Sequence, residues 1–207
     1  MTTSSWSLVD AEPLAKEHKY TFFKPSSETI SKVQVGENVK LMFRFQSETA
    51  DAPDAERMWV IVNKMNPNGS YVGSLDNDPY WIKDLKAGDE VAFQACHIIS
   101  TEHSEPGNIV DRFSERCFVT QRILKDGAAV GYLYREAPDD EDDSGWRLTA
   151  NDESQEYMDE KSNIQYVSLG RVLSCTDAFI HLLDSEVGAV FVLDTKSNTY
   201  LRTPSDA

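Results

Sequence analysis

The sequence predicts an α+β protein made of two small domains, each an antiparallel twisted sheet with one or two helices. At 207 residues, with 40% hydrophobic and 10% aromatic residues, the chain can form two separate cores. Short strand-like runs recur in both halves and are separated by glycine-containing turns. The polar, turn-forming stretch 100–108 has little to bury. We therefore expect an N-terminal domain at 1–99, a linker at 100–112 and a C-terminal domain at 113–207.

The first half begins with one or two helices, expected around residues 8–18 and 26–32. Alternation of apolar and polar residues over 39–45 then predicts a half-buried strand, and the continuous apolar run 58–62 predicts a central strand. The pair Asn68-Gly69 supplies the positive φ angles of a tight hairpin that returns through 71–75. Gly88-Asp89 turns into a further strand at 91–96.

The second half begins with two expected strands, 117–124 and 129–136, joined in a hairpin across Asp126-Gly127. Pro138 ends the second of them, and extended chain resumes at 145–148. Asn151 or Asp152 is expected to cap a short helix that runs to Met158. Asp177 is expected to cap another, in which Phe179, Ile180 and Leu183 share one face. The runs 189–194 and 198–202 complete the domain as strands.

The charge balance restricts the classes of partner. Thirty-five acidic residues against twenty basic ones give a net charge of -15 and a pI near 4.6. Nucleic acid and anionic membranes would be bound against this field, so neither is expected as a partner. The same field would attract a basic protein, such as one that itself binds nucleic acid. Acidity that only maintains solubility is the simpler alternative.

Much of this charge lies in one segment. Residues 136–160 contain eleven acidic residues and one basic residue, a net charge of −10. Within it, five consecutive carboxylates precede a turn at Ser144-Gly145 and then Trp146: Asp139, Asp140, Glu141, Asp142 and Asp143. We expect this acidic, water-facing loop to receive a basic partner.

Cysteine usage and the first residues predict a cytoplasmic protein. Cys96, Cys117 and Cys175 are odd in number, far apart and without a C-x-x-C motif, as is typical of free, buried thiols in a reducing compartment. Residues 1–6 lack the basic segment and apolar core of a secretory signal. No apolar run approaches the roughly 18 residues of a membrane span.

The sequence contains no constellation typical of catalysis. Nucleophile-elbow, zinc-protease and phosphate-loop motifs are absent, and the four histidines are scattered. Cys96 and His97 are adjacent on an expected strand, so their side chains would point to opposite faces. His103 is expected to be solvated in the linker, and His181 to be a partly buried structural residue. We expect no catalytic residues and no cofactor.

The acidic loop also fits a metal site poorly. A calcium loop starting at Asp140 would place Asp142, Ser144 and Gly145 correctly, but Asn151 occupies the position that needs a bidentate glutamate. A pair of carboxylates for glycoside cleavage would need a cleft that raises one pKa, and a hydrated loop offers none. No metal site is expected.

Several ordered motifs carry a family resemblance. The motifs of the second half are 117–123 (Cys-Phe-Val-Thr-Gln-Arg-Ile), 130–136 (Val-Gly-Tyr-Leu-Tyr-Arg-Glu), 143–147 (Asp-Ser-Gly-Trp-Arg), 152–154 and 157–158. Through them the second half, over about 113–193, resembles domain-of-unknown-function family 2185, which is grouped with the immunity-protein-33 type of bacterial polymorphic toxin systems. The first half resembles domain-of-unknown-function family 2314 through residues 58–60, 73–79 and 85–91. Together the halves resemble the immunity protein that accompanies a nuclease effector of a type VI secretion system.

The resemblance implies a cytoplasmic protein that binds and blocks a cognate toxin, expected to be a basic nuclease domain. It supplies no list of binding residues. Clustered carboxylates could cover a nuclease's basic surface, while tight binding also needs central anchors, for which Tyr80, Trp81, Trp146 and Tyr157 are candidates. A tryptophan after a glycine turn is more often part of a core. The expected partner-binding residues are Asp139, Asp140, Glu141, Asp142, Asp143, Trp146 and Tyr157.

Two other classes of function stay open at this point. One is a small cytoplasmic regulatory or scaffolding module without a toxin partner, which genomic neighbourhood would distinguish from an immunity protein. The other is an enzyme, against which the missing catalytic constellation argues. A homo-oligomer is compatible with the sequence.

Overall fold

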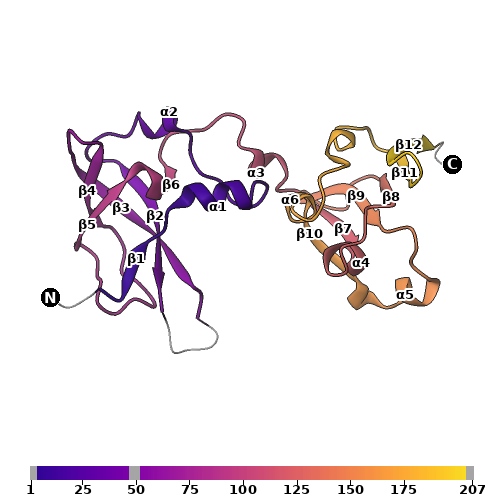
Figure 1. Ribbon diagram of the computed structural model, residues 1–207, viewed down its shortest axis with the longest axis horizontal. Coiled ribbons are helices and arrows are strands. Elements are labelled where there is room, and N and C mark those ends of the chain that lie inside the picture. The colour runs from indigo at the N-terminus through magenta and orange to yellow at the C-terminus, as the bar shows by residue number, and fades with distance from the viewer. Residues whose placement is uncertain (1–3, 47–51, 204–207) are drawn as a thin grey trace. The chain divides into compact units, whose positions relative to one another are not determined.

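The computed structural model describes residues 4–46 and 52–203. The chain divides into two compact units, Met1–Asn108 and Ile109–Ala207, and the described residues of each include a six-stranded sheet (Figure 1). The helices are few and short. The predicted α+β class, with two small sheet domains, is confirmed.

The first sheet is antiparallel throughout and is centred on β2 (Asn38–Phe45) and β3 (Ala55–Met65). Its order is β1-β2-β3-β4-β5, and β6 also pairs with β2. Alternate residues of β2 are buried, as the pattern predicted, and they join the core residues of β3 on one face. The other strands are β1 (Trp6–Leu8), β4 (Ser70–Leu75), β5 (Glu90–Gln94) and β6 (Ile98–Thr101).

The predicted hairpin at Asn68-Gly69 is present between β3 and β4. Gly69 has a φ of +80° and donates its N–H to the Asn66 carbonyl oxygen at 3.0 Å. Asn68 does not adopt a positive φ; its side-chain oxygen instead accepts a hydrogen bond from the Ser70 N–H at 3.1 Å. One glycine therefore supplies the left-handed conformation that was expected of both residues.

The helices of the first unit are shorter than expected. α1 (Ala11–Glu17) begins after Asp10, whose carboxylate accepts from the Glu12 N–H at 2.9 Å, and α2 (Ser27–Ile30) begins after Ser26. Leu8, where the first helix was expected to begin, instead belongs to β1, which pairs with β2. The expected strand 91–96 ends at Gln94, and a 3₁₀ turn, η1 (Ala95–His97), follows.

Part of the expected linker is held against the first unit. β6 extends to Thr101, and the Glu102 carboxylate accepts from both the backbone N–H and the side-chain amide of Asn38, at 3.1 and 2.9 Å. The His103 ring lies 2.9 Å from the Glu37 carboxylate, so His103 is half-buried and paired rather than solvated. The second unit opens with α3 (Ile109–Arg112).

The second sheet has the order β10-β7-β9-β8-β11-β12. β7 and β9 run parallel and every other described pair is antiparallel, so this sheet is mixed rather than antiparallel throughout, as was expected. Its strands are β7 (Arg116–Thr120), β8 (Tyr132–Arg135), β9 (Asp143–Thr149), β10 (Ile164–Ser168), β11 (Val190–Asp194) and β12 (Thr199–Thr203).

The expected hairpin across Asp126-Gly127 is wrong. β7 ends at Thr120, and residues 121–124 form the helical turn α4 (Gln121–Leu124), closed by the Lys125 N–H on the Gln121 carbonyl oxygen at 2.8 Å. Ile123 of α4 is buried in the core. β9 then lies between β7 and β8, so these two strands do not pair.

Serines cap the other two α-helices of the second unit. Ser154, rather than Asn151 or Asp152, caps α5 (Gln155–Asp159), and η2 (Lys161–Asn163) follows it. α6 (Leu169–Leu173) was not anticipated and contributes Val172 and Leu173 to the core. The helix expected after Asp177 is the 3₁₀ turn η3 (Ile180–Leu182).

One face of the second sheet forms that unit's core. Its buried strand residues include Cys117, Val119, Leu133, Trp146 and Leu148. Within the described ranges, no helix is both long and apolar enough to cross a membrane.

Candidate partner-binding site

The five-carboxylate run does not behave as one surface. Asp139, Asp140, Glu141 and Asp142 are exposed in the loop between β8 and β9. Asp143 is the first residue of β9 and is only 4% exposed. The first four, called the acidic loop below, are therefore available to a partner, whereas Asp143 is part of the interior.

A buried ion pair explains the position of Asp143. The Arg147 guanidinium donates two hydrogen bonds to its carboxylate, from Nη1 at 2.9 Å and from Nη2 at 2.8 Å. The same carboxylate accepts from the backbone N–H groups of Asp139 at 3.0 Å and Gly145 at 2.9 Å. These hydrogen bonds, chiefly those from Arg147, hold the pKa of Asp143 well below its usual range.

Arg147 connects this ion pair to the sheet surface. Its Nε donates to the Glu136 carboxylate at 2.5 Å, and its Nη2 lies 3.5 Å from the Asp139 carboxylate. Its guanidinium lies 4.7 Å from the centre of the Phe118 ring. The acidic loop therefore borders a set of side chains on the outer face of the sheet.

Two expected anchors are structural residues. Trp146 is 1% exposed, donates its indole N–H to the Leu183 carbonyl oxygen at 3.3 Å and stacks with Phe191, with ring centres 6.4 Å apart. Tyr157 is half-buried, and its hydroxyl accepts from the Arg122 backbone N–H at 3.1 Å. The alternative prediction, that Trp146 is part of the core, is therefore confirmed.

The other two anchor candidates lie in the first unit. Tyr80 is 75% exposed and packs edge-on against Trp81, which is half-buried. The Glu56 carboxylate accepts from the backbone N–H groups of Tyr80 and Trp81, at 2.7 and 3.0 Å, and fixes this turn. Tyr80 is accessible to a partner.

Sequence reasoning missed a row of aromatic residues on the outer face of the second sheet. In the strand register, Tyr166 lies beside Phe118, Phe118 beside Arg147, and Arg147 beside Tyr134. Neighbours in register project from the same face. Tyr132 projects from this face too, because it lies two residues before Tyr134 on β8. We call Phe118, Tyr132, Tyr134 and Tyr166 the aromatic face.

The sequence contained a signal for this face, namely residues that alternate between buried and more exposed positions along β7 and β8. Phe118 lies between buried Cys117 and Val119, and Leu133 is buried between the two half-exposed tyrosines of β8. This is the period of a strand with one face in the core. The aromatic residues concealed it, because aromatic side chains are usually assigned to a core.

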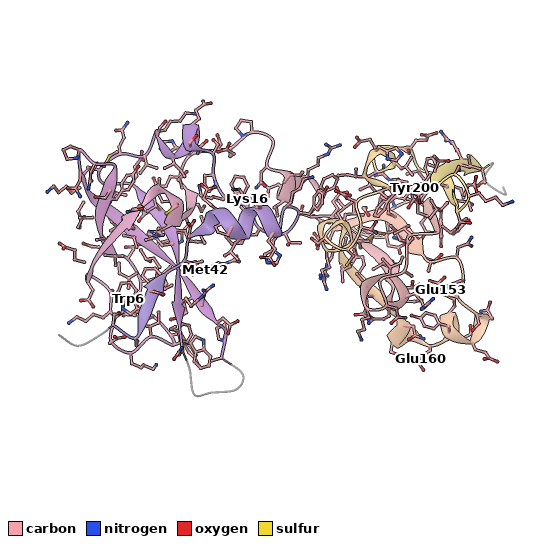
Figure 2. The ribbon with its side chains drawn as sticks, viewed as in Figure 1. Trp6, Lys16, Met42, Glu153, Glu160 and Tyr200 are labelled. Atoms are coloured by element: carbon pink, nitrogen blue, oxygen red, sulfur yellow. The ribbon has the colours of Figure 1, made fainter. Side chains whose placement is uncertain are left out.

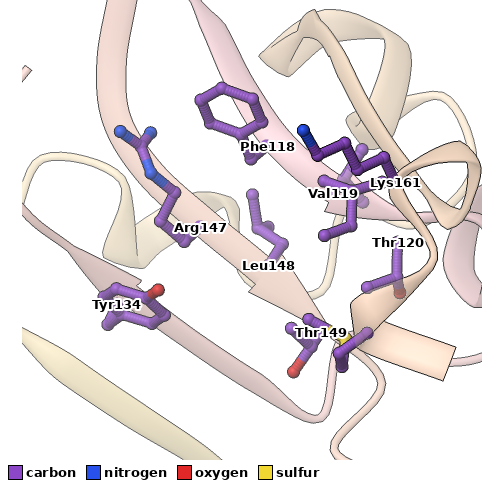
Figure 3. A pocket seen from close by; sticks show the side chains of 10 residues that line it. Phe118, Val119, Thr120, Tyr134, Arg147, Leu148, Thr149 and Lys161 are labelled. Atoms are coloured by element: carbon purple, nitrogen blue, oxygen red, sulfur yellow. The ribbon is translucent and has the colours of Figure 1, made fainter. Parts of the chain in front are cut away.

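A cavity of about 420 Å³ opens beside the aromatic face (Figure 3). Phe118, Tyr134 and Thr149 project from the strands around it, and Lys161 approaches from η2. Most of the exposed lining is apolar. The full lining is Phe118, Val119, Thr120, Tyr134, Arg147, Leu148, Thr149, Met158, Lys161 and Ile164.

Hydrogen bonds of Glu153 fix the end of the sheet beside this cavity. Its carboxylate accepts from the Thr120 hydroxyl at 2.5 Å and from the Ala150 N–H at 2.8 Å. Glu153 and Glu160, on either side of α5, are labelled in Figure 2. The position of α5, and with it Met158, is thereby tied to β7 and β9.

The cysteines and histidines do not assemble into a reactive site. Cys117 is buried, and burial raises its pKa to about 12, whereas Cys175 is exposed and Cys96 is intermediate, so only one is a core residue. His97 lies in η1 rather than on a strand, and its Nδ1 accepts from the Gln94 N–H at 3.1 Å. His181 is exposed. Among the residues that the structure describes, no group of three or more His, Cys, Asp or Glu side chains could hold a metal ion.

Two known families are similar to the chain. Residues 8–133, more than half of it, match a family described as an uncharacterized protein conserved in bacteria (DUF2314), and residues 117–203 match the Immunity protein Imm33 domain. The Imm33 match includes the aromatic face, the acidic loop and the cavity. No curated protein and no solved structure matches the chain. The two family resemblances found in the motifs are confirmed.

Proposed function

The chain belongs to the bacterial family DUF2314, and because its second half also matches the Imm33 immunity domain, we propose that it is an immunity protein that binds and neutralises a cognate toxin. The Imm33 match is the observation that carries the proposal. The toxin is a nuclease effector of a type VI secretion system, and neutralisation occurs in the cytoplasm of the producing cell. It proceeds by stoichiometric binding, without catalysis.

Electrostatics support a basic nuclease as the toxin. A nuclease presents lysine and arginine side chains to phosphate groups. The protein carries a net charge of -15, and the four carboxylates of the acidic loop are exposed. Such a surface attracts a basic domain and can occupy the region that would otherwise contact nucleic acid.

Co-expression with the toxin encoded by the neighbouring gene tests the proposal. Cells that produce the toxin should survive when this protein is present, and the two proteins should co-purify. With purified components, nuclease activity should fall linearly and vanish at one equivalent of this protein, because each molecule blocks one toxin molecule. An unrelated protein of similar pI, produced at the same level, controls for charge alone. Continued killing despite soluble expression would refute the proposed function.

A further inference from the structure

Building on the proposed function, we infer that the cavity beside the aromatic face anchors the toxin by receiving an apolar side chain from a basic segment of it. The proposal assigns separate tasks to two neighbouring features. The cavity holds the complex together, and the acidic loop attracts the partner.

The lining of the cavity suits an apolar side chain. Its volume of about 420 Å³ lies within the range of sites that bind small molecules, roughly 300–1,000 Å³. Phe118 is 36% exposed, and Tyr134, Met158 and Ile164 are half-exposed around it. Partly exposed aromatic and aliphatic side chains around a concave surface are typical of binding hot spots, where burial on association releases water from apolar surface.

The charge at the Arg147 side of the cavity indicates which residues of the toxin should flank the apolar side chain that fills the cavity. Arg147 is ion-paired with Asp143 and Glu136, so its own charge is offset. The acidic loop adjoins the aromatic face directly, since the Tyr166 hydroxyl donates to the Asp140 carboxylate at 3.2 Å. Excess negative charge therefore borders the apolar cavity. A partner that fills the cavity would gain most from lysine or arginine residues next to its apolar anchor.

Lys161 provides an internal check on this assignment. It lies on the opposite side of the cavity from Arg147 (Figure 3) and forms no ion pair among the described residues. An anionic ligand would use Lys161 as its main contact. A basic segment would be repelled by it, so removing this charge should not weaken the complex.

The decisive variant fills the cavity and leaves the acidic loop unchanged. Thr149→Phe adds a ring at the lining, and Thr199→Phe, at an exposed position of β12 outside the cavity, is its matched control. Met158→Trp fills the same space from α5 and serves where Thr149→Phe does not fold. Circular dichroism and urea unfolding confirm folding. Association and dissociation rates are measured against a catalytically inactive form of the toxin encoded by the neighbouring gene.

The wild-type protein must first bind this toxin, and failure to do so would refute the proposed function and this inference with it. Given binding, the filled variants should dissociate at least about tenfold faster, with an association rate close to that of wild type. Thr199→Phe should behave as wild type, and Lys161→Gln should bind as well or better. Wild-type dissociation of both folded, cavity-filled variants would overturn the inference while leaving the proposed function intact. Strong weakening by Lys161→Gln would overturn it as well, in favour of an anionic anchor.

Discussion

Asp143 shows how one residue in a uniform run of charge can differ from its neighbours. The carboxylates before it in the run remain in water, whereas Asp143 lies at the start of β9 with both oxygens bound by Arg147. A buried ion pair gives little net stability compared with an apolar pair, but removing one partner leaves the other charge uncompensated. Asp143 is therefore a structural residue within a segment that is otherwise exposed to solvent.

We predict that Asp143→Asn lowers the free energy of unfolding by about 3 kcal/mol at pH 7. The pKa of Asp143 is lower in the folded protein than in the unfolded chain, so its stabilising contribution is present above the unfolded value of about 3.9. That contribution is lost as the pH falls through the folded-state pKa. The difference between wild type and variant should therefore shrink in acid, as urea unfolding at pH 7 and pH 3 would show.

Asp142→Asn is the matched control for this substitution. Asp142 is exposed and adjacent, and no ion pair holds its side chain in the structure's described part. Its replacement should change stability by less than about 0.5 kcal/mol at either pH. An equal effect of the two substitutions would contradict the structural role of Asp143.

Gly145 provides a second prediction at the residue scale. Its φ is +78°, and a β-carbon there would collide with the Glu136 carbonyl oxygen. Glu136 is itself held in place, because its N–H donates to the Gly145 carbonyl oxygen. Gly145→Ala should cost about 3 kcal/mol, from the left-handed conformation and the collision together. Gly127 has a φ of +71° with open space around it, so Gly127→Ala should cost only about 1 kcal/mol. Thermal or urea unfolding would measure both, and equal losses would rule out the collision.

At the scale of elements, local signals predicted strands better than their pairing. The alternation over β2, the apolar run of β3 and the glycine turn before β4 are each short local patterns, and the structure confirms all three. The supposed hairpin between β7 and β8 failed because β9, which comes later in the chain, inserts between them. Nothing in residues 117–136 indicates that insertion. Strand order depends on long-range packing, which turn residues alone do not determine.

The same dependence on long-range packing explains why the sequence predicted only part of the candidate site. Sequence located the acidic loop, but it could not show that Asp143 turns inward, because the bidentate contact depends on Arg147 within the folded strand. The aromatic face arises from three strands that come together only in the tertiary structure. The alternation in the sequence indicates that each of these residues faces away from the core, but it does not predict that they gather beside a cavity.

The acidic loop yields a prediction at this scale. Replacing Asp139, Asp140 and Asp142 with Asn and Glu141 with Gln, while keeping Asp143, should leave folding intact and slow association with the toxin by about tenfold at low salt. Dissociation should change little, because exposed rim charges act mainly on encounter. Stopped-flow rates over a range of ionic strength would measure this, and the difference from wild type should shrink as salt screens the loop.

A control with the same change in net charge separates the loop from the general field. Asp54→Asn combined with Glu17→Gln, Glu28→Gln and Glu90→Gln removes four exposed carboxylates from the first unit. If this variant slowed association with the toxin as much as the loop variant does, total charge rather than the loop would steer the toxin.

At the scale of the whole molecule, the two family matches do not coincide with the two compact units. The DUF2314 match continues to residue 133, past the unit boundary at residue 108, and overlaps the Imm33 match over residues 117–133. The Imm33 match, the acidic loop and the cavity all lie in the second unit. Each unit has its own sheet and core, which is the property expected of parts that fold separately.

We therefore predict that residues 109–207, produced alone, fold cooperatively and bind the toxin with a dissociation constant within about tenfold of that of the full chain. The reason is that this unit contains both the proposed anchor and the acidic loop. Residues 1–108, produced alone, should fold as well but should not protect cells. Urea unfolding and calorimetric titration would test both fragments. A folded 109–207 fragment without affinity, beside a full chain that binds, would place essential contacts in the first unit, where exposed Tyr80 would be the next residue to replace.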